Sequence, residues 1–373
     1  MTRLIALAAG AALAAATPRG LSVPAGFTLE QIATVAHARE LAAAPNGDLI
    51  VGTLDGDVAI VPDAEGTPGT PYVFVRLDDR PAAGVALAGD ALYIGAQFGI
   101  YRVRYRPGGH DPGAGPEKIA SVRTSGESRD HVTTTVAPAG ELLYASVGSS
   151  CNNCDPDLDA TRASIQMMQL DGSGLRPKAV HIRNAIALAV NPATGTLWAG
   201  VAGQDELAHG HPYEIFDALT LRPGIVDYGW PYCYEDRKAV GAHDCANAPI
   251  PRVVFPAYET PIGAAFYPSG ERGRYAFPPA YRGGAFVALH GSWHMPLVPP
   301  RVVFVPMDGD QPRTPVDWND PAKQWIEFVG GFQKADGVTR VARPTGVTVG
   351  PQGSLFVSDD LTGAIFRIRP AKG

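Results

Sequence analysis

Alternating hydrophobic and polar residues recur along the chain in pairs of short runs, and a turn rich in proline, glycine and asparagine joins the two runs of each pair. The clearest turns are Pro45–Gly47, Pro138–Gly140, Pro192–Gly195 and Pro351–Gly353. A period of two residues is typical of a half-buried strand, and turns of this composition join antiparallel strands. Each pair of runs therefore predicts a β-hairpin.

Two looser copies of the same unit occur, one at Gly84–Val103 and one at Ile262–Val305, where an insertion separates the two runs. The second runs of the first two hairpins, marked by Leu49 and Leu92, are 43 residues apart, which suits one four-stranded blade with its loops. Six copies predict an all-β fold, a six-bladed β-propeller. We expect the run at residues 27–35 to pair with the last blade, because that pairing removes an open sheet edge.

Polar pairs precede the first strand of several hairpins, and the two most chemically active are Asp130-His131 and Arg183-Asn184. His131, Asn184 and Arg343 lie seven, eight and eight residues before the prolines of their turns. Equivalent positions in different blades lie at the same height around the axis, so these side chains are expected at one mouth of the channel. A channel lined with polar groups that bind only water is the alternative, but the two pairs together favour a functional site.

Composition agrees with one all-β domain. The chain has 373 residues, including 43 glycines and 34 prolines, and only 18% of its residues are charged. Many strands joined by tight turns have this composition. Single all-β domains often reach this length and the repeats leave no linker, so we expect one domain at residues 17–373.

The first 16 residues resemble a secretory signal peptide: a short basic start, an apolar stretch too short to span a bilayer, and an Ala14–Ala16 cleavage site. The mature protein is therefore expected to be periplasmic or secreted, without a membrane span; a retained anchor is the alternative. Export allows disulfides, and Cys151–Cys154 and Cys233–Cys245 are the expected pairs. Asp155 follows Cys154, so the attachment signature of c-type haem is absent.

The net charge of −6 and the lack of basic clusters argue against nucleic acid or anionic membranes as partners. A small-molecule substrate fits better. His131 has the properties of a general base, and Asp130 is suited to bind a hydroxyl or to stabilise charge on His131. Arg183, Asn184 and Arg343 offer donors to a planar, carbonyl-rich or carboxylated ligand, which suits an anionic cofactor.

An oxygen-rich segment, Gly203-Gln204-Asp205, follows the Arg-Asn hairpin and is a candidate calcium loop, because backbone carbonyls and a carboxylate are ligands that Ca²⁺ prefers. The nearby His209-x-His211 pair is an alternative site for a transition metal, although two histidines in a surface loop are more often only solvated.

Several segments together resemble the glucose/sorbosone dehydrogenase family, most closely its sorbosone dehydrogenase-like branch. They are DHVTTTVAPAGELLYASVGSSCNNC, IRNAIALAVNPATGTLWAG, GQDEL, YGWPYCY, AFVALHGSWH and RPTGVTVGPQGSLFVSDDLTGAIFRI. The resemblance covers nearly the whole mature chain. It implies a six-bladed propeller that binds pyrroloquinoline quinone (PQQ) with calcium, oxidises an aldose or similar sugar or aldehyde, and passes electrons to a small carrier or a cytochrome.

The same resemblance implies roles for individual residues. His131 would be the base, Asp130 a substrate contact, and Arg183 and Asn184 would bind the quinone oxygens. Arg343 would contact a cofactor carboxylate, and the segment Gly203, Gln204 and Asp205 would supply calcium ligands.

Two departures from the family pattern lie near these residues. Ser149 and Ser150 follow Gly148, where the glucose dehydrogenase branch has an acidic residue that orients the histidine, and His294-Met295 replace the Asn-Arg that usually follows HGSW. Two other functions stay open: a calcium-dependent lactonase or esterase in which His131 activates water, and a propeller that binds a ligand without catalysis.

Overall fold

The computed structural model describes residues 20–124, 130–157, 159–208 and 210–371. In this part of the chain the secondary structure is β-strand, apart from three short 3-10 helices, Leu219–Leu221, Pro279–Tyr281 and Pro321–Gln324. The predicted all-β class is confirmed. Among the described residues no helix has the length and apolar character needed to cross a membrane. The expected signal peptide, residues 1–16, lies outside the described residues.

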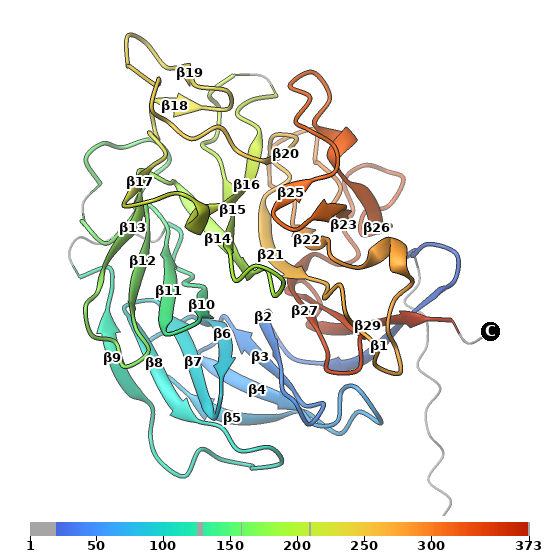
Figure 1. Ribbon diagram of the computed structural model, residues 1–373. Helices are drawn as coiled ribbons and strands as arrows, with labels where there is room; N and C mark the ends of the chain where they lie inside the picture. Colours follow the sequence, from blue (N-terminus) through green and yellow to red (C-terminus); the bar gives the residue numbers. More distant parts are fainter. Residues whose placement is uncertain (1–19, 125–129, 158, 209, 372–373) are drawn as a thin grey trace, which may run out of the picture.

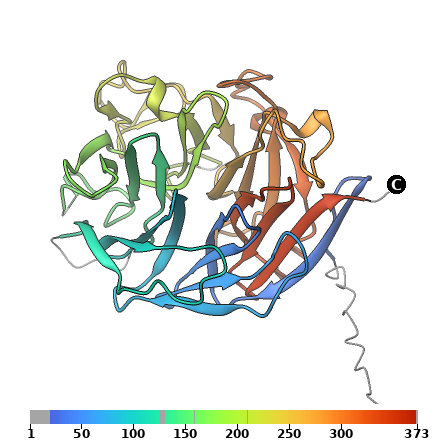
Figure 2. The same ribbon diagram turned by 60° about the horizontal axis from the view of Figure 1, so that its bottom comes forward.

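The strands form sheets arranged around a central axis, as in a β-propeller (Figures 1 and 2). The first group contains β2 (Ala38–Ala43), β3 (Leu49–Thr53), β4 (Asp57–Val61) and β5 (Tyr72–Arg76), and the second contains β6 (Ala82–Ala88), β7 (Ala91–Ala96), β8 (Gly99–Arg104) and β9 (Glu117–Ser121). A single residue pair, Thr53 with Ala82, joins β3 to β6, so these two groups form one eight-stranded sheet.

The remaining sheets follow in chain order. The third contains β10 (Val136–Ala139), β11 (Leu142–Val147), β12 (Ser164–Gln169), β13 (Arg176–Val180) and β17 (Val226–Asp227). The fourth contains β14 (Asn184–Val190), β15 (Leu197–Ala202), β16 (Glu214–Ala218) and β20 (Val253–Phe255), and the next contains β21 (Pro261–Phe266), β22 (Ala285–Leu289), β23 (Arg301–Val305) and β26 (Ile326–Val329). Two small hairpins pair β18 (Cys233–Tyr234) with β19 (Lys238–Ala239), and β24 (Met307–Asp308) with β25 (Gln311–Pro312).

The last sheet joins the two ends of the chain. It contains β27 (Pro344–Val349), β28 (Leu355–Asp359) and β29 (Ala364–Pro370), and β1 (Phe27–Thr34) pairs antiparallel with β29. Figure 2 shows the blue first strand beside the red last one. The predicted pairing of the N-terminal strand with the last hairpin is confirmed.

Large side chains fill the spaces between neighbouring sheets. Trp198, Phe216 and Phe266 pack together where the β14–β20 sheet meets the β21–β26 sheet. Phe286 and Phe328 belong to a second buried cluster between β21–β26 and the last sheet. Burial of these aromatic side chains stabilises the circular arrangement of the sheets by removing apolar surface from water.

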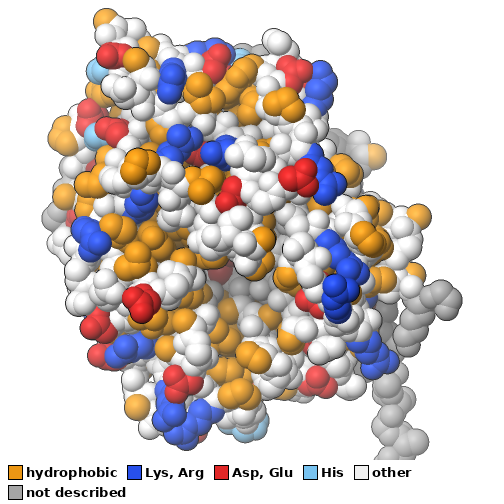
Figure 3. Space-filling model, in the orientation of Figure 1, with side chains coloured by type: hydrophobic (Ala, Val, Ile, Leu, Met, Phe, Trp, Pro, Cys, Tyr) orange, Lys and Arg blue, Asp and Glu red, His pale blue; other side chains and the backbone are white. Residues whose placement is uncertain are grey.

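Strands β2, β6, β10, β14, β21 and β27 supply the residues that line a central channel. Figure 3 shows that the molecule is hollowed near the middle of one face. Five of these strands, all except β10, have a register shift close to their first residue. Such bulges bend a strand and redirect its side chains, and here they lie beside the polar residues that precede the strands.

Both expected disulfides are present, and they account for all four cysteines. Cys151 is bonded to Cys154, and Cys233 is bonded to Cys245. The first closes a ring of four residues after β11, and the second closes the loop that carries the β18–β19 hairpin.

A buried carboxyl in the channel should make stability depend on pH. Glu40 on β2 is 8% exposed, its Oε1 has no hydrogen-bond partner among the described residues, and burial raises its pKa to about 8. A raised folded-state pKa gives stability that is complete below the ordinary pKa and is lost as the pH rises towards 8. The glutamine side chain of E40Q does not titrate. The free energy of unfolding of E40Q minus that of wild type should therefore increase by about 1.4 kcal/mol per pH unit between pH 5 and 8.

Urea unfolding at pH 5, 6.5 and 8 would measure this effect. E141Q, which changes an exposed glutamate at the turn between β10 and β11, is the matched control and should show a constant difference from wild type. If the E40Q and wild-type stabilities change in parallel across this range, the Glu40 carboxyl does not titrate as described.

Candidate functional site

His131 lies in the loop before β10, in the left-handed backbone region with φ of 46°. Its Nδ1 is 2.9 Å from the Ser149 carbonyl oxygen and 3.1 Å from Ser149 Oγ. A carbonyl oxygen only accepts, so Nδ1 carries the proton and Nε2 keeps its lone pair. Nε2 has no hydrogen-bond partner within the described part of the chain. Ser149 therefore fixes the tautomer that a general base needs.

Two buried arginines hold the backbone around His131. Arg162 Nε donates to Gly148 O at 3.0 Å, and Arg162 NH2 donates to Asp130 O at 2.6 Å and to Ser149 O at 2.7 Å. Arg123 NH2 donates to His131 O at 2.8 Å and to Thr133 O at 2.9 Å. These bonds give donors to carbonyl groups around His131, including that of the buried Gly148. The loop that carries the predicted base is thus fixed from both sides.

The surroundings of His131 strongly favour the neutral imidazole. Burial and the positive charge of Arg183, with smaller effects of Arg162 and Arg123, lower its pKa to about 3, against an opposing effect of the Ser149 carbonyl. The neutral form can accept a proton. An anionic ligand placed beside it would raise the pKa and make it a stronger base.

Arg183 and Asn184 lie at the start of β14, next to His131. A Cβ on Gly148 would come within 2.4 Å of Asn184 Oδ1 and within 2.5 Å of His131 Cβ. Only glycine therefore allows these two side chains to approach each other across that backbone. The Asn184 side-chain amide has no hydrogen-bond partner in the described residues and is available to a ligand.

Arg183 is buried and anchored to the predicted calcium segment. Its NH2 group lies 3.0 Å from Asp205 Oδ2 and donates at 3.0 Å to Asn152 Oδ1. The Asp205 carboxylate thus balances the charge of Arg183 in the low-dielectric interior.

Gly203 and Gln204, which follow β15, have backbone oxygens of the kind that calcium binds. The Gly203 N–H donates to Glu214 Oε2 at 2.6 Å, which fixes the turn. Neither carbonyl oxygen, of Gly203 or of Gln204, accepts a hydrogen bond from the described residues. Two carbonyl oxygens without donors, beside the Asp205 carboxylate, fit a hard cation.

The described side chains offer no comparable site for a transition metal. Cys151, Cys154 and Asp157 are the only described His, Cys, Asp or Glu side chains that lie close enough in a group of three to hold one ion, and the two cysteines are bonded to each other. His211 Nδ1 contacts Glu235 Oε1 at 2.6 Å. His209, the other member of the predicted pair, lies outside the described residues.

Arg343 belongs to a second cluster of charged groups, just before β27. Its NH2 lies 2.8 Å from His290 Nδ1 and donates to Gly291 O at 2.9 Å. The Asp360 carboxylate lies 3.1 Å from His290 Nε2 and accepts from Arg39 NH1 at 2.8 Å. The hydrogen bond from His290 and the positive charges around Asp360 lower its pKa to about 2, despite its burial. Three sheets thus contribute to one ionic network.

A single loop connects the two clusters. At its start, His290 and Gly291 contact Arg343 of the second cluster. Four residues after His290, His294 Nε2 lies 3.7 Å from Asp205 Oδ1 of the first cluster. The His294 ring stacks on Tyr258 with 4.0 Å between ring centroids. The structure therefore groups His131, Asn184, Arg183 and the Gly203–Asp205 segment, and places Arg343 in the neighbouring cluster.

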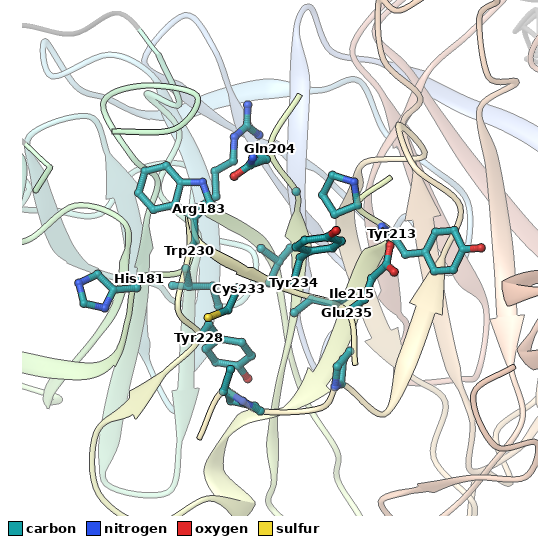
Figure 4. A pocket seen from close by; sticks show the side chains of 17 residues that line it. His181, Arg183, Gln204, Tyr213, Ile215, Tyr228, Trp230, Cys233, Tyr234 and Glu235 are labelled. Carbon is teal, nitrogen blue, oxygen red and sulfur yellow. Dashed lines mark hydrogen bonds between the residues drawn. The ribbon is translucent and has the colours of Figure 1, made fainter. Parts of the chain in front are cut away.

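A cavity of about 70 Å³ lies behind Arg183, between the start of β14 and the β18–β19 hairpin (Figure 4). Arg183 and Gln204 lie side by side at one end of it, and the Trp230 ring is next to Arg183. Among its polar residues, Glu235 is bonded to His211 and Lys238. The sequence patterns did not predict this cavity.

The chain is similar in sequence to several known proteins. A protein-family model described as TrAA12-like matches residues 222–371. A PQQ-dependent sugar dehydrogenase from Hypocrea jecorina is 23% identical over 336 residues, which are 76% of this chain and 73% of that protein. An uncharacterized protein from Borreliella burgdorferi is 27% identical over 196 residues, 51% of this chain, and the match spans only about half (48%) of that relative.

Two solved structures have the same fold. The PQQ domain of pyranose dehydrogenase from Coprinopsis cinerea, in its holo form, superposes with a TM-score of 0.81 at 19% identity and covers 96% of this chain and 99% of that one. A calcium structure of the Trichoderma reesei carbohydrate-active enzyme of family AA12 has a TM-score of 0.78 at 20% identity, with the same coverage. The expected resemblance is therefore confirmed: this chain is similar to the PQQ-dependent sugar dehydrogenases in sequence over most of its length and in fold over nearly all of it.

Proposed function

We propose that this chain is an exported, PQQ- and calcium-dependent dehydrogenase that oxidises a sugar or sugar aldehyde. The observation that carries the proposal is the lone pair of His131 Nε2 close to the side-chain amide of Asn184, both without a hydrogen-bond partner among the described residues. The relatives that are PQQ-dependent sugar dehydrogenases support the cofactor and the substrate class.

The residues present fit an anionic quinone and a calcium ion. The Asn184 amide and the Arg183 guanidinium would face the quinone oxygens, and Arg343 would bind a cofactor carboxylate. The carbonyl oxygens of Gly203 and Gln204 would hold calcium, with Asp205 supplying negative charge. Bound PQQ would supply the electrophilic carbon that accepts a hydride from the sugar.

The protein's own contribution is positioning and proton transfer. His131 Nε2 takes the proton of the substrate hydroxyl, and the Ser149 carbonyl keeps the imidazole oriented through Nδ1. Asp130 contacts the substrate. Electrons leave afterwards to a small carrier or a cytochrome, and the protein is located in the periplasm or outside the cell.

We also propose that the ring consists of six blades. The β2–β5 and β6–β9 groups count as two of them, because one residue pair joins them while adjacent strands within each group are paired along their lengths. The strands that line the channel then each form the inner edge of one blade.

Titration of EDTA-treated mature protein with PQQ, with and without Ca²⁺, tests the function. A dye-linked assay on a panel of aldoses and sorbosone follows the titration. We expect stoichiometric, calcium-dependent binding together with dye reduction. Absence of PQQ binding would reject the proposal and would favour a lactonase or a non-catalytic propeller, which hydrolysis of lactones would then separate.

A further inference from the structure

Asn152 lies in the four-residue ring that the Cys151–Cys154 disulfide closes, and its polar atoms contact three other segments. Its side-chain Oδ1 accepts from Arg183 NH2 at 3.0 Å and from the Asp205 N–H at 2.7 Å. Its Nδ2 donates to the Asp205 carbonyl oxygen at 3.0 Å. One amide therefore fixes both the guanidinium and the backbone of the segment that follows β15.

The backbone of Asn152 adds two further bonds. Its carbonyl oxygen accepts from Arg183 Nε at 3.2 Å and from Trp230 Nε1 at 3.2 Å. Arg183 is thus held by Asn152 through two of its nitrogens, which sets the direction and the plane of the guanidinium. Because that plane decides how a guanidinium meets a flat ligand, the Asn152 contacts determine what Arg183 can bind.

The same ring is connected to the predicted base through Ser149. Ser149 Oγ donates to the Cys151 carbonyl oxygen at 2.6 Å and lies 3.1 Å from His131 Nδ1. The short disulfide ring is therefore linked to the base through Ser149 on one side, and contacts the cation and the calcium segment on the other. Since the covalent ring restricts the backbone of Asn152, it lowers the entropy cost of keeping these contacts aligned.

We propose that Asn152, held in place by the Cys151–Cys154 disulfide, is a positioning residue for the cofactor: it fixes Arg183 and the Gly203–Asp205 segment in the arrangement that binds the quinone and calcium. The proposal rests on the proposed function for the identity of the ligand. The arrangement of Asn152, Arg183 and the Gly203–Asp205 segment does not depend on that function, because the protein alone already has it.

The N152A variant tests the role in binding. We expect its PQQ dissociation constant, measured with saturating Ca²⁺, to rise about 10- to 100-fold, as is typical when an outer-shell partner is removed. The melting temperature of the cofactor-free protein should fall only slightly, because Arg183 keeps its bonds to the residue-152 carbonyl oxygen and to the Asp205 carboxylate. N153A is the matched control, because Asn153 is in the same ring, is exposed, and makes no hydrogen bond to the described residues. N152D keeps the acceptor for Arg183 but loses the donor to the Asp205 carbonyl, so its affinity should be intermediate.

Exchange of backbone amide hydrogens gives a readout that needs no cofactor. In N152A the amide of Asp205 loses its acceptor and should exchange faster than in wild type and in N153A. The double variant C151S/C154S should show the same faster exchange, whereas C233S/C245S, which removes the other disulfide, should not.

The two readouts separate failure of the inference from failure of the function. If wild type binds no PQQ, the proposed function fails, and exchange at Asp205 alone decides whether Asn152 positions this segment. If wild type binds PQQ but N152A binds it equally well, or if N153A weakens binding as much as N152A, the positioning role is wrong.

Discussion

The H131A variant should bind PQQ and calcium as tightly as wild type and lose turnover by about 10²- to 10⁴-fold, the usual contribution of a positioned base. The reason is geometric: no described residue bonds to His131 Nε2, which leaves it for the substrate, whereas the proposed cofactor contacts are Arg183, Asn184 and Arg343. Titration with PQQ and steady-state kinetics with the best substrate from the panel would measure the two quantities separately.

H181A is the matched control for this prediction. His181 is half-exposed, lies before strand β14 and pairs with Asp227 at 2.8 Å, so its loss should leave both quantities within about twofold of wild type. An H131A variant that keeps its turnover would assign the proton transfer to another group and would reject the base proposed here.

Replacement of the buried Arg162 in R162M should lower the free energy of unfolding by about 2 kcal/mol or more. Arg162 donates to three carbonyl oxygens around His131. The Ser149 oxygen keeps the His131 Nδ1–H as a donor, so the oxygens of Gly148 and Asp130 lose theirs, and each acceptor that loses its donor costs about 1–3 kcal/mol. The same change removes one of the positive charges that lower the pKa of His131, so this pKa should rise. Urea unfolding would give the first quantity, and histidine NMR titration would give the second.

R176M controls for loss of an arginine as such. Arg176, on β13, is exposed, and within the described residues its side chain bonds only to the nearby Gly174 carbonyl. The free energy of unfolding of R176M should therefore stay within about 0.5 kcal/mol of wild type. If R162M is as stable as R176M, water or neighbouring groups satisfy the three carbonyls, and Arg162 does not fix the loop.

The hairpins and the closing strand were predictable because their signals are local. Alternation of apolar residues and a Pro-Gly turn identify β27 and β28 without reference to the rest of the chain. The N-terminal strand needed one further argument, that an unpaired sheet edge is unfavourable, and its pairing with β29 is confirmed. The disulfides followed from the expected export and from short spacings.

The supports of the site were not predictable, because their partners are distant in sequence and follow no period. Arg123 and Arg162 lie between hairpins and bind carbonyl groups, which every residue has. Arg39 meets Asp360 at a separation of 321 residues. Such contacts exist only after the sheets have packed around the axis, so composition and spacing carry no trace of them.

Ser149 stands where the glucose dehydrogenase branch has an acidic residue that orients the histidine. A serine can still form a hydrogen bond to His131, but it cannot stabilise the imidazolium by charge. In the structure the Ser149 backbone oxygen orients the imidazole, and any residue at this position could supply that oxygen. The difference therefore concerns charge rather than orientation, because, besides burial, the positive charges of Arg183, Arg162 and Arg123 lower the pKa of His131.

The pairing of β1 with β29 sets an order for biosynthesis. The sheet that contains both strands is incomplete until β29 has left the ribosome, and β29 then pairs with a strand made more than 300 residues earlier. Until that moment β1 is without its neighbour, and its exposed edge can pair with other chains. The ring of sheets therefore closes only after β29 has been made, and a chain that stops short of this strand keeps the open edge.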